Sequence, residues 1–193
     1  MAIADVLFGD YNPGGRLPVT FYKSVDQLPP FTDYRMQGRT YRYFKAEPLY
    51  PFGFGLSYTK FHYEKLKLST ARLKAGSDLR ITAEVQNVGD RAGDEVVQLY
   101  ISDLAASVPV PVRSLAGMQR LSLKAGERRT VSFSVSPNQM SLIDDRGRRV
   151  VEPGEFLVTV GGRQTGFAPS GAVAISTVIT GRFVIAGKAA VIR

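Results

Sequence analysis

The sequence has no cysteine, no tryptophan and a single histidine, His62. The absence of cysteine excludes disulfides, thiol nucleophiles and cysteine metal sites, and one histidine excludes multi-histidine metal clusters. No apolar run reaches the roughly 18 residues that a membrane-spanning helix needs. Residues 1–10 lack the basic start and cleavage site of a secretory signal, which leaves the compartment open. We therefore expect no metal, no cofactor and no membrane partner.

The positive charge is spread along the chain. Residues 1–61 hold 7 Lys/Arg against 5 Asp/Glu, and residues 62–193 hold 18 against 12, for a net charge of +8. A basic set in the second half could serve an anionic partner, but acids at Glu127, Asp144 and Asp145 interrupt it, so a solvated face is the simpler interpretation. We expect no nucleic acid partner. The basic set is Arg120, Lys124, Arg128, Arg129, Arg146, Arg148 and Arg149.

Aromatic residues and prolines are concentrated at the beginning. Fourteen of the 20 Phe and Tyr lie in residues 1–61, together with six of the 11 prolines. Proline removes backbone donors and fixes φ, so this region cannot be a long helix or a central strand. We predict an irregular arm over residues 38–61 that large rings anchor along the following domain.

Two short elements are expected before the arm. Ile3, Val6 and Leu7 form an apolar face at helical spacing, and Gly9 ends it. No N-cap precedes this helix, so we interpret it as the end of a longer one and expect residues 2–21 to be poorly supported. Residues 17–21 are a strand candidate, at a sheet edge because of Pro18.

From residue 62 the pattern changes to period 2, as in half-buried antiparallel strands. Four runs place apolar residues at 81/83/85, 97/99/101, 131/133/135 and 156/158/160, and residues 178–185 offer a closing strand. Turn signals separate the runs at 74–76, 124–126, 145–147 and 152–155, the last suited to a type II turn. We predict seven or eight short strands in a two-sheet antiparallel β-sandwich over residues 62–193.

Four long motifs then resemble one family, in the same order. They are ADVLFGDYNPGGRLPVTF at 4–21, GRTYRY at 38–43 with LYPFGFGLSYT at 49–59, NVGDRAGDEVVQLY at 87–100, and VEPGEF at 151–156. The chain resembles the C-terminal region of family 3 glycoside hydrolases. The resemblance implies a remnant of their α/β-sandwich domain (1–37), a linker arm (38–61) and a fibronectin type III-like, immunoglobulin-like β-sandwich (62–193).

The resemblance also implies a parent enzyme, and it places this chain outside the catalytic domains of that enzyme. Family members are mostly retaining β-glucosidases and β-xylosidases, with a nucleophile and an acid/base residue upstream of the region matched here. Neither motif is present, so the resemblance implies that the catalytic domains of the parent are the partner. It allows a periplasmic or secreted parent.

The chain's own acids do not suggest catalysis. Retaining glycoside hydrolysis needs two carboxyl groups about 5–5.5 Å apart. Asp94 and Glu95 are strand neighbours that point to opposite faces, and Asp144 and Asp145 flank a turn. His62 has no triad pattern around it. We predict no catalytic residues.

Candidate contacts lie in the arm, at Arg39, Tyr41, Arg42 and Tyr43. These side chains could contact either a sugar or another domain. For the aromatic rings, anchoring of the arm is the simpler interpretation.

Three functions remain open. We favour a structural domain that packs on the catalytic domains of a β-glycosidase. The alternatives are an independent carbohydrate- or surface-binding module and a nucleic-acid binder. The exposed N-terminal segment is also a candidate for self-association.

Overall fold

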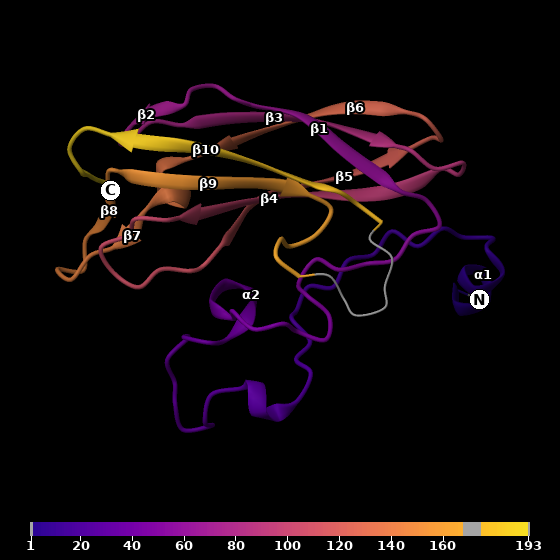
Figure 1. Ribbon diagram of the computed structural model, residues 1–193, viewed down its shortest axis with the longest axis horizontal. Helices are drawn as coiled ribbons and strands as arrows, with labels where there is room; N and C mark the ends of the chain where they lie inside the picture. Colours follow the sequence, from indigo (N-terminus) through magenta and orange to yellow (C-terminus); the bar gives the residue numbers. More distant parts are fainter. Residues whose placement is uncertain (1, 168–174, 193) are drawn as a thin grey trace.

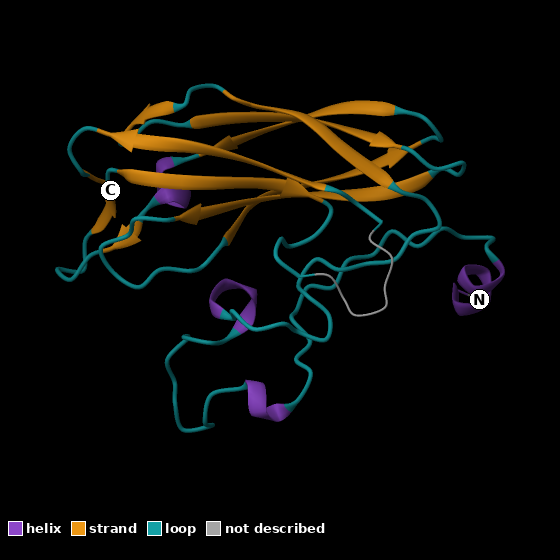
Figure 2. Ribbon diagram, in the orientation of Figure 1, coloured by secondary structure: helices purple, strands orange, loops and turns teal. Residues whose placement is uncertain are grey.

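The structure is a computed structural model that describes residues 2–167 and 175–192. Two β-sheets pack face to face, and the first 60 residues run along one side of this sandwich with little regular structure (Figures 1 and 2). The fold is mainly β and fibronectin type III-like, as the sequence predicts. No helix among the described residues has the length and apolarity to cross a bilayer.

The first sheet has three antiparallel strands in the order β1-β3-β6. These are β1 (Phe61–Leu68), β3 (Leu79–Asn87) and β6 (Arg128–Val135). Along β3, every second side chain is buried, at Ile81, Ala83 and Val85, while the residues between them are half-buried. This alternation fits a sheet with one face on the core and one toward solvent.

The second sheet has five strands in the order β2-β10-β9-β4-β5. These are β2 (Arg72–Lys74), β10 (Val178–Ala186), β9 (Gly154–Gly161), β4 (Gly93–Asp103) and β5 (Ser114–Leu123). Strand β2 pairs with β10 in parallel, and the other pairs are antiparallel. The predicted all-antiparallel sandwich is therefore wrong at this one pair.

Short elements close the ends of the sandwich. The hairpin of β7 (Leu142–Ile143) and β8 (Arg149–Val151), with β11 (Ala190–Val191), forms a small third sheet. Gly147 has φ +72° in the predicted turn of this hairpin. The described residues thus contain eleven strands, and those beyond the predicted seven or eight are only two or three residues long. A 3₁₀ turn, η2 (Pro137–Met140), precedes the hairpin.

The first 60 residues contain α1 (Ala2–Phe8), the 3₁₀ turn η1 (Val25–Gln27) and α2 (Thr40–Tyr43). The predicted helix at residues 2–8 is confirmed, with Gly9 in a left-handed conformation after it. The predicted strand at residues 17–21 is wrong, because only an isolated bridge joins Phe21 to Tyr50. Leu17 also donates to the carbonyl of Phe54 and accepts from the N–H of Gly53, but the chain bends at Pro18 and Val19, so no continuous ladder forms.

The predicted type II turn at Glu152–Pro153–Gly154 is also wrong. Such a turn needs a positive φ at Gly154, and the structure shows none there. Gly154 instead begins strand β9 and pairs with Ile185 of β10. The boundaries at residues 37 and 61 remain predictions.

The core lies between the two sheets and holds nearly all of the buried apolar residues. Phe156 and Phe183 face each other on β9 and β10, with stacked rings 5.3 Å apart and side chains that are 1% exposed. We expect Phe183→Ala to lower the free energy of unfolding by about 3–5 kcal/mol, because it removes a ring and leaves a cavity. Urea unfolding followed by tyrosine fluorescence measures this.

The matched control is Val184→Ala on the same strand. Val184 is 40% exposed on the opposite face, so its truncation should change stability by about 0.5 kcal/mol or less. Equal effects of the two substitutions would contradict this description of the core.

Candidate functional site

A buried ion pair joins the N-terminal segment to the sandwich. Nη2 of Arg16 lies 2.5 Å from Oε2 of Glu95 on β4, and the two side chains are 6% and 0% exposed. Oε1 of Glu95 accepts hydrogen bonds from the hydroxyls of Tyr63, at 2.8 Å, and Ser176, at 2.7 Å. Both carboxylate oxygens are thus occupied.

Burial sets the electrostatics of this cluster. It raises the pKa of Glu95 above its ordinary value, and the Arg16 charge and the hydroxyl donors oppose the rise. Burial and the nearby Glu95 charge raise the pKa of Tyr63 well above its ordinary value, so its phenol stays protonated and donates. A Cβ at position 162 would lie 1.9 Å from Oε1 of Glu95, so only Gly162 fits there.

A second polar contact lies on the opposite face of β4 and shares Gly162 with the ion pair. The amide of Gln98 donates to the carbonyls of Gly53, at 3.3 Å, and Gly162, at 3.0 Å, and its oxygen accepts from the Tyr100 hydroxyl. Gly53 has φ +77°, and a Cβ there would lie 2.1 Å from the Gln98 oxygen. The arm therefore approaches β4 more closely than a side chain would allow.

Asparagines fix the segment at a third place. Asn12 donates to the carbonyl of Ala92 at 2.8 Å and accepts from the backbone N–H of Tyr58. The Thr59 hydroxyl donates to the side chain of Asn87, at the end of β3. The prediction that residues 2–21 are poorly supported is thus wrong for residues 12–17. For α1 it stays a prediction: Ile3 and Leu7 are more than 70% exposed, and the carbonyl of Val6 accepts from the Tyr58 hydroxyl.

Tyr41 and Arg39 are both engaged within the chain. The Tyr41 ring stacks on Phe52 with centroids 4.2 Å apart and meets the edge of Tyr100, while its oxygen accepts from the N–H of Leu115. This supports anchoring as the role of the Tyr41 ring. Arg39 donates to backbone carbonyls of its own loop, at Pro30, Asp33 and Arg35.

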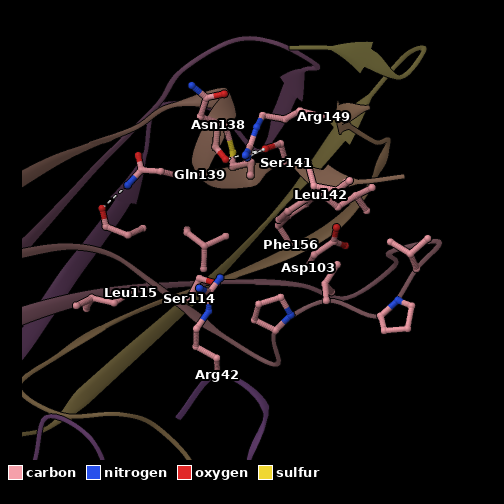
Figure 3. A pocket seen from close by; sticks show the side chains of 18 of the residues that line it. Arg42, Asp103, Ser114, Leu115, Asn138, Gln139, Ser141, Leu142, Arg149 and Phe156 are labelled. Atoms are coloured by element: carbon pink, nitrogen blue, oxygen red, sulfur yellow. Dashed lines mark hydrogen bonds between the residues drawn. The ribbon is translucent and has the colours of Figure 1, made fainter. Parts of the chain in front are cut away.

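Arg42 and Tyr43 reach a cavity instead. Its volume is about 460 Å³, and it lies between α2 and the end of the sandwich. Figure 3 shows Arg42 and Arg149 on opposite sides of it, with Asp103 on the wall between them. Contacts of the predicted residues with sugar or with another domain remain predictions.

The acids lie as the sequence indicates. Glu95 points inward, whereas Asp94 points outward to Arg120 and Ser122, which lower its pKa through hydrogen bonds. Asp144 accepts from Arg148 in its hairpin turn. Among the described residues, no three metal-ligating side chains cluster. The arrangement offers two polar junctions and one cavity.

Two family models match the chain. The glycosyl hydrolase family 3 C-terminal domain matches residues 1–58, and the fibronectin type III-like domain matches residues 95–164. The chain belongs to family 3 of the glycoside hydrolases.

Relatives in this family are similar over most of the chain. A periplasmic β-glucosidase of Salmonella typhimurium is 41% identical over 172 residues, which cover 83% of this chain and 22% of that protein. A β-xylosidase of Formosa agariphila is 42% identical over 165 residues, 83% of this chain and 23% of that one. The chain thus spans less than a quarter of the length of these curated relatives.

Solved structures of the family share the fold. β-Glucosidase 3B from Thermotoga neapolitana is 30% identical, with a TM-score of 0.82 over 99% of this chain and 27% of that one. A β-glucosidase from Erythrobacter marinus is 38% identical, with a TM-score of 0.78 over 96% and 23%. The fibronectin type III-like motif at residues 87–100 contains Glu95 and Gln98, but sequence reasoning gave neither of them a role.

Removing Arg16 tests the buried ion pair of this family 3 chain. Arg16→Met leaves an unpaired buried carboxylate and should lower the free energy of unfolding by about 3–5 kcal/mol at neutral pH. Without Arg16 the folded-state pKa of Glu95 rises further, so the loss should shrink as the pH falls toward the ordinary value of 4.5. Urea unfolding at neutral and acid pH measures both effects.

Two variants serve as controls. Arg16→Met with Glu95→Gln removes both charges while keeping an acceptor for Tyr63, and it should recover most of the loss. Arg120→Met breaks the exposed pair with Asp94 and should have little effect. An Arg16→Met loss as small as that of Arg120→Met would contradict a structural role for the buried pair.

Proposed function

We propose that this chain is the non-catalytic C-terminal part of a β-glycosidase and that it packs against and stabilises the catalytic domains. The parent enzyme would hydrolyse β-glucosides or β-xylosides, because the relatives named above carry those activities.

The distribution of apolar side chains carries the proposal. Of the 21 exposed large apolar side chains among the described residues, 15 lie in residues 2–58. Of the 25 buried ones, Phe44 alone lies in that segment. A segment that buries almost no core of its own and exposes many apolar residues is suited to an interface.

One loop presents this surface in a fixed shape. Phe31 and Tyr34 are 92% and 88% exposed at the tip of the segment between η1 and α2. Arg39 binds three backbone carbonyls beneath them, and Arg35 pairs with Asp33. A braced loop loses little conformational freedom on docking, which favours a stable contact.

The acids support a non-catalytic role. Glu95 is buried in its ion pair, and Asp94 and Asp144 are held by arginines on the surface. We therefore expect the purified chain to hydrolyse neither p-nitrophenyl β-glucoside nor p-nitrophenyl β-xyloside. Release of nitrophenolate is the measurement. Turnover that follows the chain through purification and disappears in an Asp94→Asn or Asp103→Asn variant would contradict the proposal.

A chimera tests the packing role. This chain would replace the matching segment of the Salmonella typhimurium β-glucosidase, and activity and thermal inactivation would be compared with a Phe31→Ser/Tyr34→Ser version. We expect the double variant to inactivate at lower temperature, because buried aromatic residues at interfaces each contribute about 2 kcal/mol or more.

The matched control is Val88→Ser/Met118→Ser. These two side chains are 51% and 68% exposed, but they lie on the sandwich and not on the N-terminal segment. The chimera should tolerate this pair. Equal sensitivity to both pairs, or to neither, would count against packing through residues 2–58.

A further inference from the structure

The cavity at the end of the sandwich collects polar groups with unused hydrogen-bonding capacity. Oδ1 of Asp103 accepts from the N–H of Ala105, and no described residue contacts its Oδ2 through a hydrogen bond. Arg42 uses one of its five donors, in a 3.3 Å bond to Ser114. Asn138 makes no side-chain hydrogen bond within the described part of the chain.

The fourth polar group is Arg149, whose Nη1 donates to the Ser141 hydroxyl at 3.1 Å. These groups come from four separate places: α2, the end of β4, η2 and β8 (Figure 3). Burial raises the pKa of Asp103, the Ala105 N–H opposes the rise, and the nearby Glu152 carboxylate adds to it. A half-buried carboxylate of this kind favours ligands that donate hydrogen bonds.

An anion does not fit this arrangement. Phosphate sites bring cationic side chains together around one group. Here Arg42 and Arg149 lie on opposite sides of the cavity, with the carboxylate of Asp103 between them. That carboxylate would repel a phosphate or a nucleic acid backbone.

An extended peptide does not fit either, because the sheet edge beside the cavity is already occupied. The N–H of Leu115 donates to Tyr41, and the carbonyl of Ala116 accepts from Gln139. Strand addition needs free backbone groups at an edge. The remaining capacity therefore lies in side chains.

A sugar unit offers both kinds of partner. Each hydroxyl both donates and accepts, so hydroxyls can donate to Asp103 while others accept from the arginines. Prolines and aliphatic residues, among them Pro109, Pro111 and Leu142, supply apolar walls for the C–H faces. The volume of about 460 Å³ is in the usual range for small-molecule sites.

We propose that this cavity is a saccharide-binding site for β-linked glucose or xylose units, in which Asp103, Arg42 and Arg149 bind the hydroxyls. The choice of glucose and xylose units rests on the parent activity proposed above, whereas the site itself does not depend on the packing role.

Titration of the full ¹⁵N-labelled chain with cellobiose and xylobiose tests the site. We expect at least one of them to shift the amide signals of Asp103, Ser114 and Asn138, with Kd on the order of millimolar. Sorbitol is the control ligand, because it carries hydroxyls without a ring. Asp103→Ala should weaken binding about tenfold or more, as for loss of a hydrogen bond to a charged group.

Asp78→Asn is the matched control: it alters an exposed acid outside the cavity and should bind as the unmodified chain does. If Asp103→Ala does not fold, Arg42→Gln decides, because Arg42 is exposed and its loss should also weaken binding. The proposal is overturned if neither disaccharide shifts the cavity signals, if sorbitol acts equally, or if the deciding variant binds unchanged.

Discussion

The arrangement of this chain depends on the ion pair between Arg16 and Glu95. Two charges removed from water are tolerated only if their geometry is good and the remaining hydrogen-bonding capacity is satisfied. Tyr63 and Ser176 occupy the second carboxylate oxygen, and Gly162 leaves the space that this oxygen needs. Because Arg16 belongs to the N-terminal segment and Glu95 to β4, these conditions are met in one docked position. The pair therefore specifies where the segment lies.

Docking covers part of the outer face of the five-stranded sheet. Gln98 and Tyr100, on the face of β4 away from the sandwich core, are buried beneath the arm. The molecule then has two unlike outer surfaces. The outward face of β1-β3-β6 carries charged and hydroxyl side chains, whereas the arm exposes Phe31, Tyr34 and other apolar groups. A polar attachment on one side of the arm holds an apolar surface on its other side, as the proposed packing against catalytic domains requires.

The sequence predicted the sandwich well, because burial on one face leaves a period-2 pattern, as in Ile81, Ala83 and Val85. The sequence-based prediction failed where the arm covers the outer face of a sheet and buries a polar residue. Gln98 alternates with apolar neighbours and so reads as solvent-facing, yet it is 3% exposed. Pro18 marked an edge strand, but the chain bends at Pro18 and Val19 and the pairing stops at a bridge. The Arg16–Glu95 pair links residues 79 positions apart, and no local pattern encodes such a contact.

The cavity is invisible in the sequence for the same reason, since its polar groups come from four distant elements. It also depends on the docked arm, because Arg42 reaches the cavity from α2. The carbonyl of Arg42 accepts from the N–H of Val112, and the adjacent Tyr41 ring packs on Phe52 and Tyr100. A ligand that contacts both Arg42 and Asp103 binds the docked arrangement better than an undocked one. By linkage, such a ligand stabilises the docked arm by the same free energy by which docking of the arm strengthens ligand binding. In the proposed site, sugar binding is thus coupled to docking of the arm on the sandwich.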